Sequence, residues 1–82
     1  MKLIEFYTTW CSPCKIQKPI VESLVKDLNI SVDFVDIDEK PEMAAQYGVR
    51  AVPTIVILTD SGEVKKKLVG LQPASVLKEE LK

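Results

Sequence analysis

Residues 3–28, LIEFYTTWCSPCKIQKPIVESLVKDL, carry the clearest structural pattern in the chain. They open with a short apolar and aromatic run at residues 3–7, which contains one acid and is typical of a strand buried on both faces. After a few polar residues, apolar side chains recur at three- and four-residue spacing, as in an amphipathic helix. The stretch therefore predicts a buried strand followed directly by a helix, with two cysteines at the junction.

This helix is expected to begin near Cys11 and to contain two prolines. Pro13 falls in the first turn, where a missing N–H costs little, whereas Pro19 lies inside the helix and is expected to bend it. The apolar stripe of the helix comprises Ile16, Ile20, Val21, Leu24, Val25 and Leu28.

Five further segments follow at short intervals. Two are strands rich in β-branched residues, two are helices opened by a proline, and one is an edge strand reached through a hairpin turn at residues 60–62. The three lysines at residues 65–67 are expected to protect that edge from aggregation. In chain order the segments are a strand at 31–37, a short helix from Pro41 to Gly48, an inner strand at 54–58, the edge strand at 63–69, and a last helix opened by Pro73 with Val76, Leu77 and Leu81 facing the core.

The predicted order of strands and helices is βαβαββα, in a single domain of residues 1–82. Two strands joined by a helix favour a right-handed parallel crossover, and the closing hairpin supplies an antiparallel pair. We therefore expect an α/β fold with a four-stranded mixed sheet flanked by three helices, which cover both of its faces.

Composition excludes several classes of partner. The 82 residues carry 11 Lys and Arg against 12 Asp and Glu, so no basic surface for nucleic acid or an anionic membrane is expected. No apolar run approaches the ~20 residues that span a bilayer. The opening residues, MKLIEFYTTW, lack the apolar stretch of a secretory signal. We expect a cytoplasmic protein that binds neither nucleic acid nor membranes.

The absence of histidine narrows the chemistry further. It removes Cys–His nucleophile pairs, Ser–His–acid triads and every zinc site with a His ligand. The two cysteines cannot form a four-cysteine site within one chain, so no metal site is expected. Thiols, carboxylates and lysines remain as the groups that could carry chemistry.

Cys11 and Cys14, separated by Ser12 and Pro13, are the strongest functional signal. One helical turn between two cysteines brings their sulfurs within disulfide reach. Cys11 lies at the helix start, where unpaired N–H groups and the helix dipole stabilise a thiolate, so it is the candidate nucleophile. Cys14, one turn further and less exposed, is the candidate resolving thiol that releases a mixed disulfide. The alternatives are two cysteines buried as small apolar side chains, or half of a zinc site shared between chains.

Three stretches share their order and spacing with one family. They are WCSPCK at residues 10–15 with Pro19 further along the same helix, YGVRAVPT at residues 47–54, and Gly70 after the hairpin. Together they resemble the thioredoxin family over essentially the whole chain. The resemblance implies a thioredoxin fold, dithiol–disulfide exchange with protein substrates, and a cis peptide bond between Val52 and Pro53 that faces the cysteines.

The resemblance also implies how substrates are held and how the pair is recharged. Trp10, Val52, Pro53 and Gly70 would contact the substrate, with the Val52 backbone pairing with an extended segment. No cofactor is implied beyond the redox-active disulfide. The substrates would be protein disulfides, the electron donor an enzyme of the thioredoxin-reductase type or glutathione, and the chain a monomer.

The sequence departs from the family's pattern in several places. It starts at what matches the family's second strand, a minimal layout that also resembles glutaredoxins and small glutaredoxin-like thioredoxins. Ser12 stands in place of the usual Gly between the cysteines, a position that tunes the reduction potential. Glu5 stands where the family places an acid, usually Asp, under the cysteine pair. Phe34 replaces a lysine that often lies near this acid, so any lysine influence on Glu5 must come from elsewhere.

Glu5 has two interpretations. A carboxylate in a strand buried on both faces is costly unless paired, and desolvation raises its pKa. That would fit Glu5 to relay a proton to or from Cys14, as a general base. Alternatively Glu5, near the chain start, reaches solvent or pairs with a lysine and has no catalytic role.

Three functions are compared. A thioredoxin-type reductant of protein disulfides is favoured. A histidine between the cysteines would stabilise the thiolate and make the disulfide oxidising, and this chain has none. A glutathione-dependent, glutaredoxin-like reductase would carry Gly-Gly and an acidic pair before the last helix, where this chain has GLQP at residues 70–73. A non-catalytic binding module of the same fold would not require the intact cysteine pair.

Overall fold

Seven elements follow one another in the structure, a computed structural model that describes residues 1–82. They are the elements that the sequence predicts, in the predicted order. None of the helices combines the length and the apolar character needed to cross a membrane. The bounds are β1 (Lys2–Tyr7), α1 (Ser12–Leu28), β2 (Ser31–Asp36), α2 (Pro41–Gln46), β3 (Thr54–Leu58), β4 (Val64–Val69) and α3 (Ala74–Glu80).

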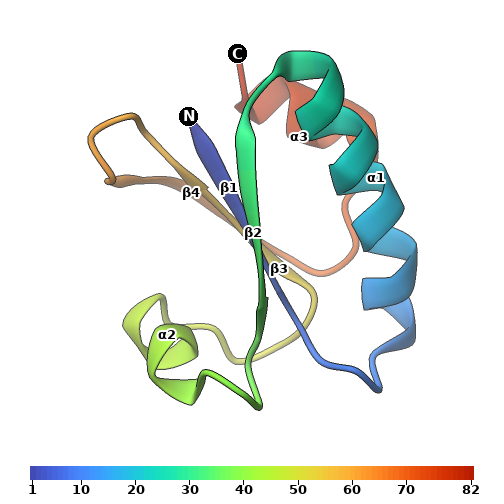
Figure 1. The fold of residues 1–82 in the computed structure, drawn as a ribbon, viewed down its shortest axis with the longest axis vertical. Coiled ribbons are helices and arrows are strands. Elements are labelled where there is room, and N and C mark those ends of the chain that lie inside the picture. Colours follow the sequence, from blue (N-terminus) through green and yellow to red (C-terminus); the bar gives the residue numbers. More distant parts are fainter.

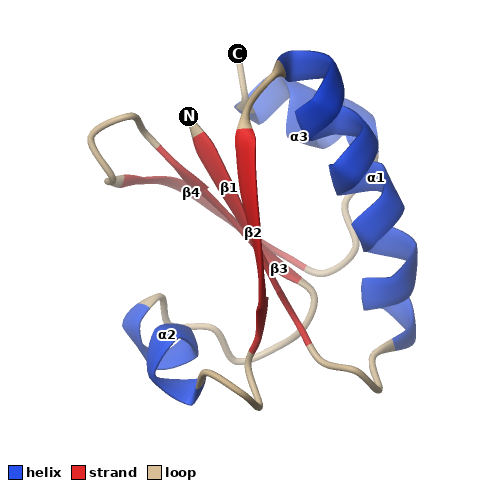
Figure 2. Cartoon of the chain, in the orientation of Figure 1, coloured by secondary structure: helices blue, strands red, loops and turns tan.

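The four strands form one mixed sheet in the order β2-β1-β3-β4. β1 pairs with β2 in parallel and with β3 antiparallel, and β3 and β4 form the closing antiparallel hairpin. Helices α1 and α3 lie on one face of the sheet and α2 on the other (Figures 1 and 2). The predicted fold class is therefore confirmed.

Two apolar clusters hold the helices to the sheet. Successive residues of a strand point to opposite faces, so Leu3 of β1 packs under α1 and α3, whereas Ile4 and Phe6 pack on the side of α2. The first cluster consists of Leu3, Val21, Leu24, Ile55, Ile57 and Leu77. The second consists of Ile4, Phe6, Val35, Val56 and Leu58. β1 and β3 thus contribute to both clusters, which explains why both strands are buried along almost their whole length.

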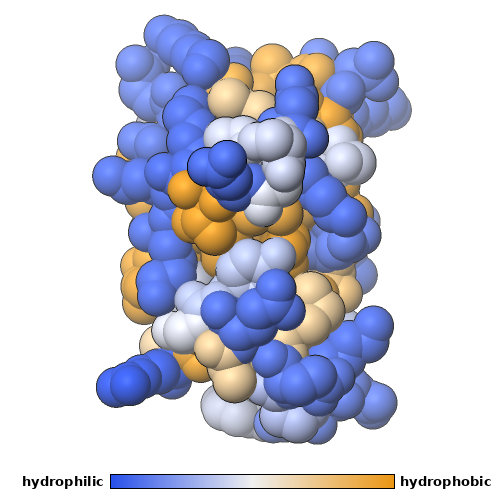
Figure 3. All heavy atoms as spheres, turned by 90° about the vertical axis from the view of Figure 1, so that its left-hand side faces the viewer, coloured by the Kyte–Doolittle hydropathy of each residue, from blue (hydrophilic) through white to orange (hydrophobic).

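The second cluster has the thinner cover, because α2 spans only 6 residues. Figure 3 looks onto this side and shows hydrophobic atoms between hydrophilic side chains in the middle of the face. The openings are narrow, since the most exposed member of the cluster, Leu58, is only 7% exposed.

Helix α1 begins and ends as its sequence predicts, but its buried face differs from the apolar stripe. Pro13 lies in the first turn, and the helix closes at Asn29 in the left-handed conformation. Ile16 is 56% exposed, because a helix turns ~100° per residue and this position falls opposite the face that carries Cys14. Gln17, a polar residue, takes the buried place beside the sheet.

Helix α3 corrects one predicted core residue. Leu77 is fully buried and Leu81 packs against the same cluster, as predicted. Val76 is 37% exposed, because the single inward-facing row of this 7-residue helix passes through Leu77 and leaves its neighbour to the side.

Strand β4 lies at the edge of the sheet, and its lysines reach both faces. Lys65 Nζ donates to the backbone carbonyl of Glu80, at 2.5 Å, beside α3. Lys67 Nζ donates to the carbonyl of Gly48, at 3.2 Å, after α2. Residues two apart in a regular strand would point to the same face. The β3–β4 pairing has a bulge between Ile57 and Leu58, and this irregularity lets the side chains of Lys65 and Lys67 reach opposite faces of the sheet.

We expect Leu77→Ala to lower the free energy of unfolding by about 2–5 kcal/mol, because it removes a fully buried side chain that joins α3 to the sheet. Val76→Ala, one residue earlier on the same helix, is the matched control and should change it by about 0.5 kcal/mol or less. Urea denaturation followed by circular dichroism measures both. Equal losses in the two variants would contradict the placement of α3.

Candidate active site

Cys11 and Cys14 form a disulfide at the first turn of α1, with their Cα atoms 5.3 Å apart. Cys11 is the N-cap residue, and its Sγ accepts a hydrogen bond from the backbone N–H of Cys14 at 3.2 Å. The sulfur thus satisfies one of the N–H groups that a helix start leaves unpaired. Cys14 was predicted to be less exposed than Cys11, but the difference is very small, since Cys11 is 4% and Cys14 3% exposed. The disulfide holds both sulfurs against the same turn.

The topology gathers the predicted site residues at one end of the sheet. The cysteines follow β1, Pro53 precedes β3 and Gly70 follows β4. In the register, Phe6 at the end of β1 pairs with Thr54, and Thr54 in turn pairs with Val69. The three segments therefore meet at the end of the sheet that lies lowest in Figure 1.

The Val52–Pro53 peptide bond is cis, as the family resemblance implies. Pro53 is buried, and its carbonyl oxygen accepts the backbone N–H of Gly70 at 2.8 Å. Gly70 has a φ of 91°, a backbone conformation that favours glycine. Thr54 Oγ1 donates to the Ala51 carbonyl at 2.6 Å, which closes the turn before β3.

Trp10 lies on the surface beside the cysteines and is 71% exposed. Its indole Nε1 donates to Asp38 Oδ2 at 3.2 Å. Asp38 follows β2, and its own backbone N–H donates to Asp36 Oδ1 at 2.9 Å. The sequence marks Asp38 only as part of an acidic turn. Its contact with Trp10 depends on β2 lying beside β1, which brings the loops after both strands together.

Glu5 lies in β1 on the same face as α1 and is only 1% exposed. Its Oε1 has no hydrogen-bond partner. Desolvation by burial raises the pKa of Glu5 to about 7, against a smaller lowering by Lys18 and a small further rise from Glu22. Glu5 and Cys14 line the same hollow of about 250 Å³. Its lining is completed by Tyr7, Thr8, Thr9, Lys15 and Lys18.

Lys18 of α1 supplies the positive charge that the neighbouring strand lacks. Phe34, which pairs with Glu5 across β1 and β2, has the Nζ of Lys18 5.2 Å from the centre of its ring. A lysine influence on Glu5 therefore comes from the helix rather than from β2. No salt bridge links the two side chains, so the interpretation of Glu5 as a solvent-exposed or ion-paired residue does not fit its surroundings.

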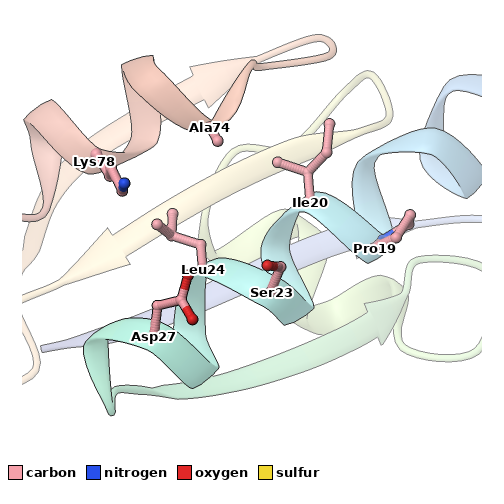
Figure 4. Close-up of a pocket in the computed structure, with 7 residues that line it drawn as sticks. All are labelled: Pro19, Ile20, Ser23, Leu24, Asp27, Ala74 and Lys78. Atoms are coloured by element: carbon pink, nitrogen blue, oxygen red, sulfur yellow. The ribbon is translucent and has the colours of Figure 1, made fainter.

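A larger groove of about 390 Å³ lies between α1 and α3 (Figure 4). It contains none of the predicted site residues. No group of three or more His, Cys, Asp or Glu side chains is arranged to hold a metal ion. The residues that line the groove are Pro19, Ile20, Ser23, Leu24, Asp27, Ala74 and Lys78.

Gln17 is the residue near the site that the sequence did not single out. Its buried side chain forms two hydrogen bonds with the backbone of Gln72, just after Gly70. A polar residue on the inward face of an amphipathic helix is the signal that could have drawn attention to it.

Comparisons with known proteins give thioredoxin over essentially the whole chain. The sequence model of the thioredoxin family matches residues 1–82. Thioredoxin from Staphylococcus epidermidis is 42% identical over 83 residues, which cover 99% of this chain and 79% of that protein.

Solved structures give the same result. A mutant thioredoxin from Halobacterium salinarum is 42% identical with a TM-score of 0.90, over 95% of this chain and 68% of that chain. Thioredoxin 1 from Thermosipho africanus is 28% identical with a TM-score of 0.90, over 99% and 90% of the two chains. A chain from a structure that describes thiol resolving in a yeast mitochondrial 1-Cys peroxiredoxin via glutathione/thioredoxin systems is 33% identical with a TM-score of 0.85, over 98% and 76%. This chain therefore belongs to the thioredoxin family and is a thiol–disulfide oxidoreductase.

Proposed function

We propose that this chain reduces protein disulfides, with Cys11 as the nucleophile and Cys14 as the resolving thiol. The position of Cys11 as the N-cap of α1 carries the proposal, because the first-turn N–H groups and the helix dipole stabilise a thiolate there. The neutral Ser12 and Pro13 between the cysteines add no positive charge that would make the pair an oxidant.

The exchange proceeds in two balanced steps. The Cys11 thiolate attacks one sulfur of the substrate disulfide, which forms a mixed disulfide and releases the other substrate sulfur as a thiolate that takes up a proton. Cys14, once deprotonated, attacks Cys11 Sγ, so that the Cys11–Cys14 disulfide forms and the second substrate thiol leaves. Two electrons pass from the dithiol to the substrate, and the disulfide at the start of α1 is the oxidised form of this cycle.

The proposed substrate surface consists of Trp10, Val52, Pro53 and Gly70. Trp10 is exposed, and the other three belong to loops at the same end of the sheet. The backbone N–H and carbonyl of Val52 take part in no intramolecular hydrogen bond in the turns and loops. They are therefore available to pair with an extended substrate segment, as an added strand would.

Glu5 is proposed to take up and return the proton of Cys14. It shares a hollow with Cys14, and burial raises its pKa to about 7, in the range where a general base works best near neutral pH. Lys18 lowers the pKa of Glu5 by a smaller amount than burial raises it, because its positive charge favours the ionised carboxylate.

The partners follow from the proposed reaction. We propose that residues 1–82 act as one monomeric domain that needs no cofactor beyond its own disulfide and serves as an electron carrier. An enzyme of the thioredoxin-reductase type is the proposed donor, and the reducing environment that the dithiol requires favours the cytoplasm. A peroxiredoxin is one class of protein substrate, supported by the peroxiredoxin work to which a similar structure belongs. Glutathione remains the alternative donor, although no feature of residues 70–73 favours it.

Cys14→Ser should trap substrates covalently, because Cys11 can still attack while nothing releases the mixed disulfide. Cys11→Ser should trap far fewer, since it lacks the nucleophile. Incubation of each variant with an excess of a disulfide-bonded protein, followed by acid quenching and non-reducing electrophoresis, measures the adduct. Equal trapping by both variants would contradict the assigned order of attack.

Glu5→Gln should remove the part of the pH dependence of the free energy of unfolding that comes from the Glu5 carboxyl group. In the wild type the folded pKa of about 7 exceeds the ordinary glutamate pKa of 4.5, so the unfolded chain ionises first and stability is lost as pH rises from 4.5 through 7. At about 1.4 kcal/mol per pKa unit, this loss amounts to about 3.5 kcal/mol in full.

The oxidised variant should therefore match the wild type near pH 4 and exceed its free energy of unfolding by about 3 kcal/mol at pH 8. Urea denaturation at both pH values tests this. Parallel profiles for the two proteins would show that Glu5 is not held in its neutral form by burial.

A further inference from the structure

Gln17 lies on the inward face of α1, one turn after Cys14, and its side chain is fully buried. Its Nε2 donates to the carbonyl oxygen of Gln72 at 3.0 Å, and its Oε1 accepts the backbone N–H of Gln72 at 2.7 Å. The primary amide thus pairs both of its ends with the backbone of one residue. Only this orientation of the amide satisfies both contacts.

The bonds of Gln72 continue toward the proposed substrate surface. Its own side-chain Nε2 donates to the carbonyl oxygens of Val69, at 3.2 Å, and Gly70, at 3.4 Å. The N–H of Gly70 in turn donates to Pro53 at 2.8 Å. A continuous series of hydrogen bonds therefore leads from the helix that carries Cys14 to the cis turn at Pro53.

An apolar side chain at position 17 would fill the same space without needing partners of its own. It would also leave the N–H and carbonyl of Gln72 without the bonds that the amide now supplies, and an unpaired polar group that stays buried is costly. The loop at residues 70–72 would then move to find water or other partners. Gln17 consequently fixes the position of this loop as well as filling the core.

We propose that Gln17 is a positioning residue that holds the loop at residues 70–72 against Pro53 and so fits the site to the extended backbone of a polypeptide disulfide. The inference rests on the proposed function, because it assumes that Pro53 and Gly70 contact the substrate. Gln17 does not touch the reacting sulfur atoms in this scheme. Small disulfides, which have no backbone to pair with this surface, should not depend on it.

The test compares Gln17→Leu with Gln46→Leu, the same substitution at an exposed residue of α2. Each variant, in its reduced form, is assayed with a disulfide-bonded peptide and with dithiobis(nitrobenzoate). For Gln17→Leu we expect the second-order rate constant for reduction of the peptide to fall about fivefold to tenfold, and the rate constant with the small disulfide to stay within about twofold. Gln46→Leu should change neither rate.

Amide hydrogen exchange of the oxidised proteins supplies a readout that is independent of activity. In Gln17→Leu the N–H groups of Gln72 and Gly70 should exchange at least about tenfold faster, while those of β1 and β3 keep their protection. If Gln17→Leu does not fold, Gln72→Ala tests the link from the loop. It keeps the backbone bonds to Gln17 but loses those to Val69 and Gly70, so a smaller peptide-selective loss, of about twofold to threefold, is expected.

A loss that is equal for both substrates, or loop amides that exchange as in the wild type, would overturn the role of Gln17. So would faster exchange in the loop with an unchanged ratio of peptide to small-disulfide rates. Failure of the proposed function is told apart from these results, because the wild type itself would then fail to reduce the disulfide-bonded peptide.

Discussion

The helix that follows the central strand is capped at its start by a cysteine sulfur. The N–H of Cys14 donates to Cys11 Sγ, and this short contact places both cysteines in the turn where a helix offers unpaired donors and the positive end of its dipole. α1 begins within a few residues of β1 and lies against the sheet, which places this turn at the end of β1. The buried row of α1 and the buried apolar residues of β1 supply that geometry. The chemistry of the pair therefore depends on packing that lies well away from the sulfurs.

The sheet register then determines what surrounds the pair. Because β1 lies between a parallel and an antiparallel neighbour, the loops after β1 and β2 and the turn before β3 meet at the same end. This arrangement brings Trp10 into hydrogen-bond contact with Asp38. The pairing of β3 with β4 likewise brings the N–H of Gly70 to the carbonyl of Pro53. Below this end, Glu5 is the one carboxylate enclosed in the sheet, and its burial is the main cause of its raised pKa, against a smaller lowering by Lys18.

Much of this arrangement could be predicted from the sequence. The strand periodicities, the prolines that open the helices and the Cys-x-x-Cys spacing each depend on a few neighbouring residues, and they gave the element order and the candidate nucleophile. The cis bond at Pro53 was predicted from the family resemblance alone. The missed features depend on contacts between distant segments. Gln17 bonds to a residue 55 positions away, and Lys18 of α1 lies over the ring of Phe34 in β2. Periodicity also overstated the core at Ile16 and Val76, because an apolar residue beside the inward row of a helix remains exposed.

The reduction potential of the Cys11–Cys14 pair decides whether this dithiol can act as a reductant of protein disulfides. Equilibration with dithiothreitol and glutathione buffers, acid trapping and thiol alkylation give the fraction of disulfide at each poise. We expect a potential below about −240 mV, near the value of about −270 mV known for thioredoxin, because the pair should donate electrons to protein disulfides. A potential above about −190 mV, or a pair that forms no intramolecular disulfide at any poise, would contradict a role as a reductant of protein disulfides.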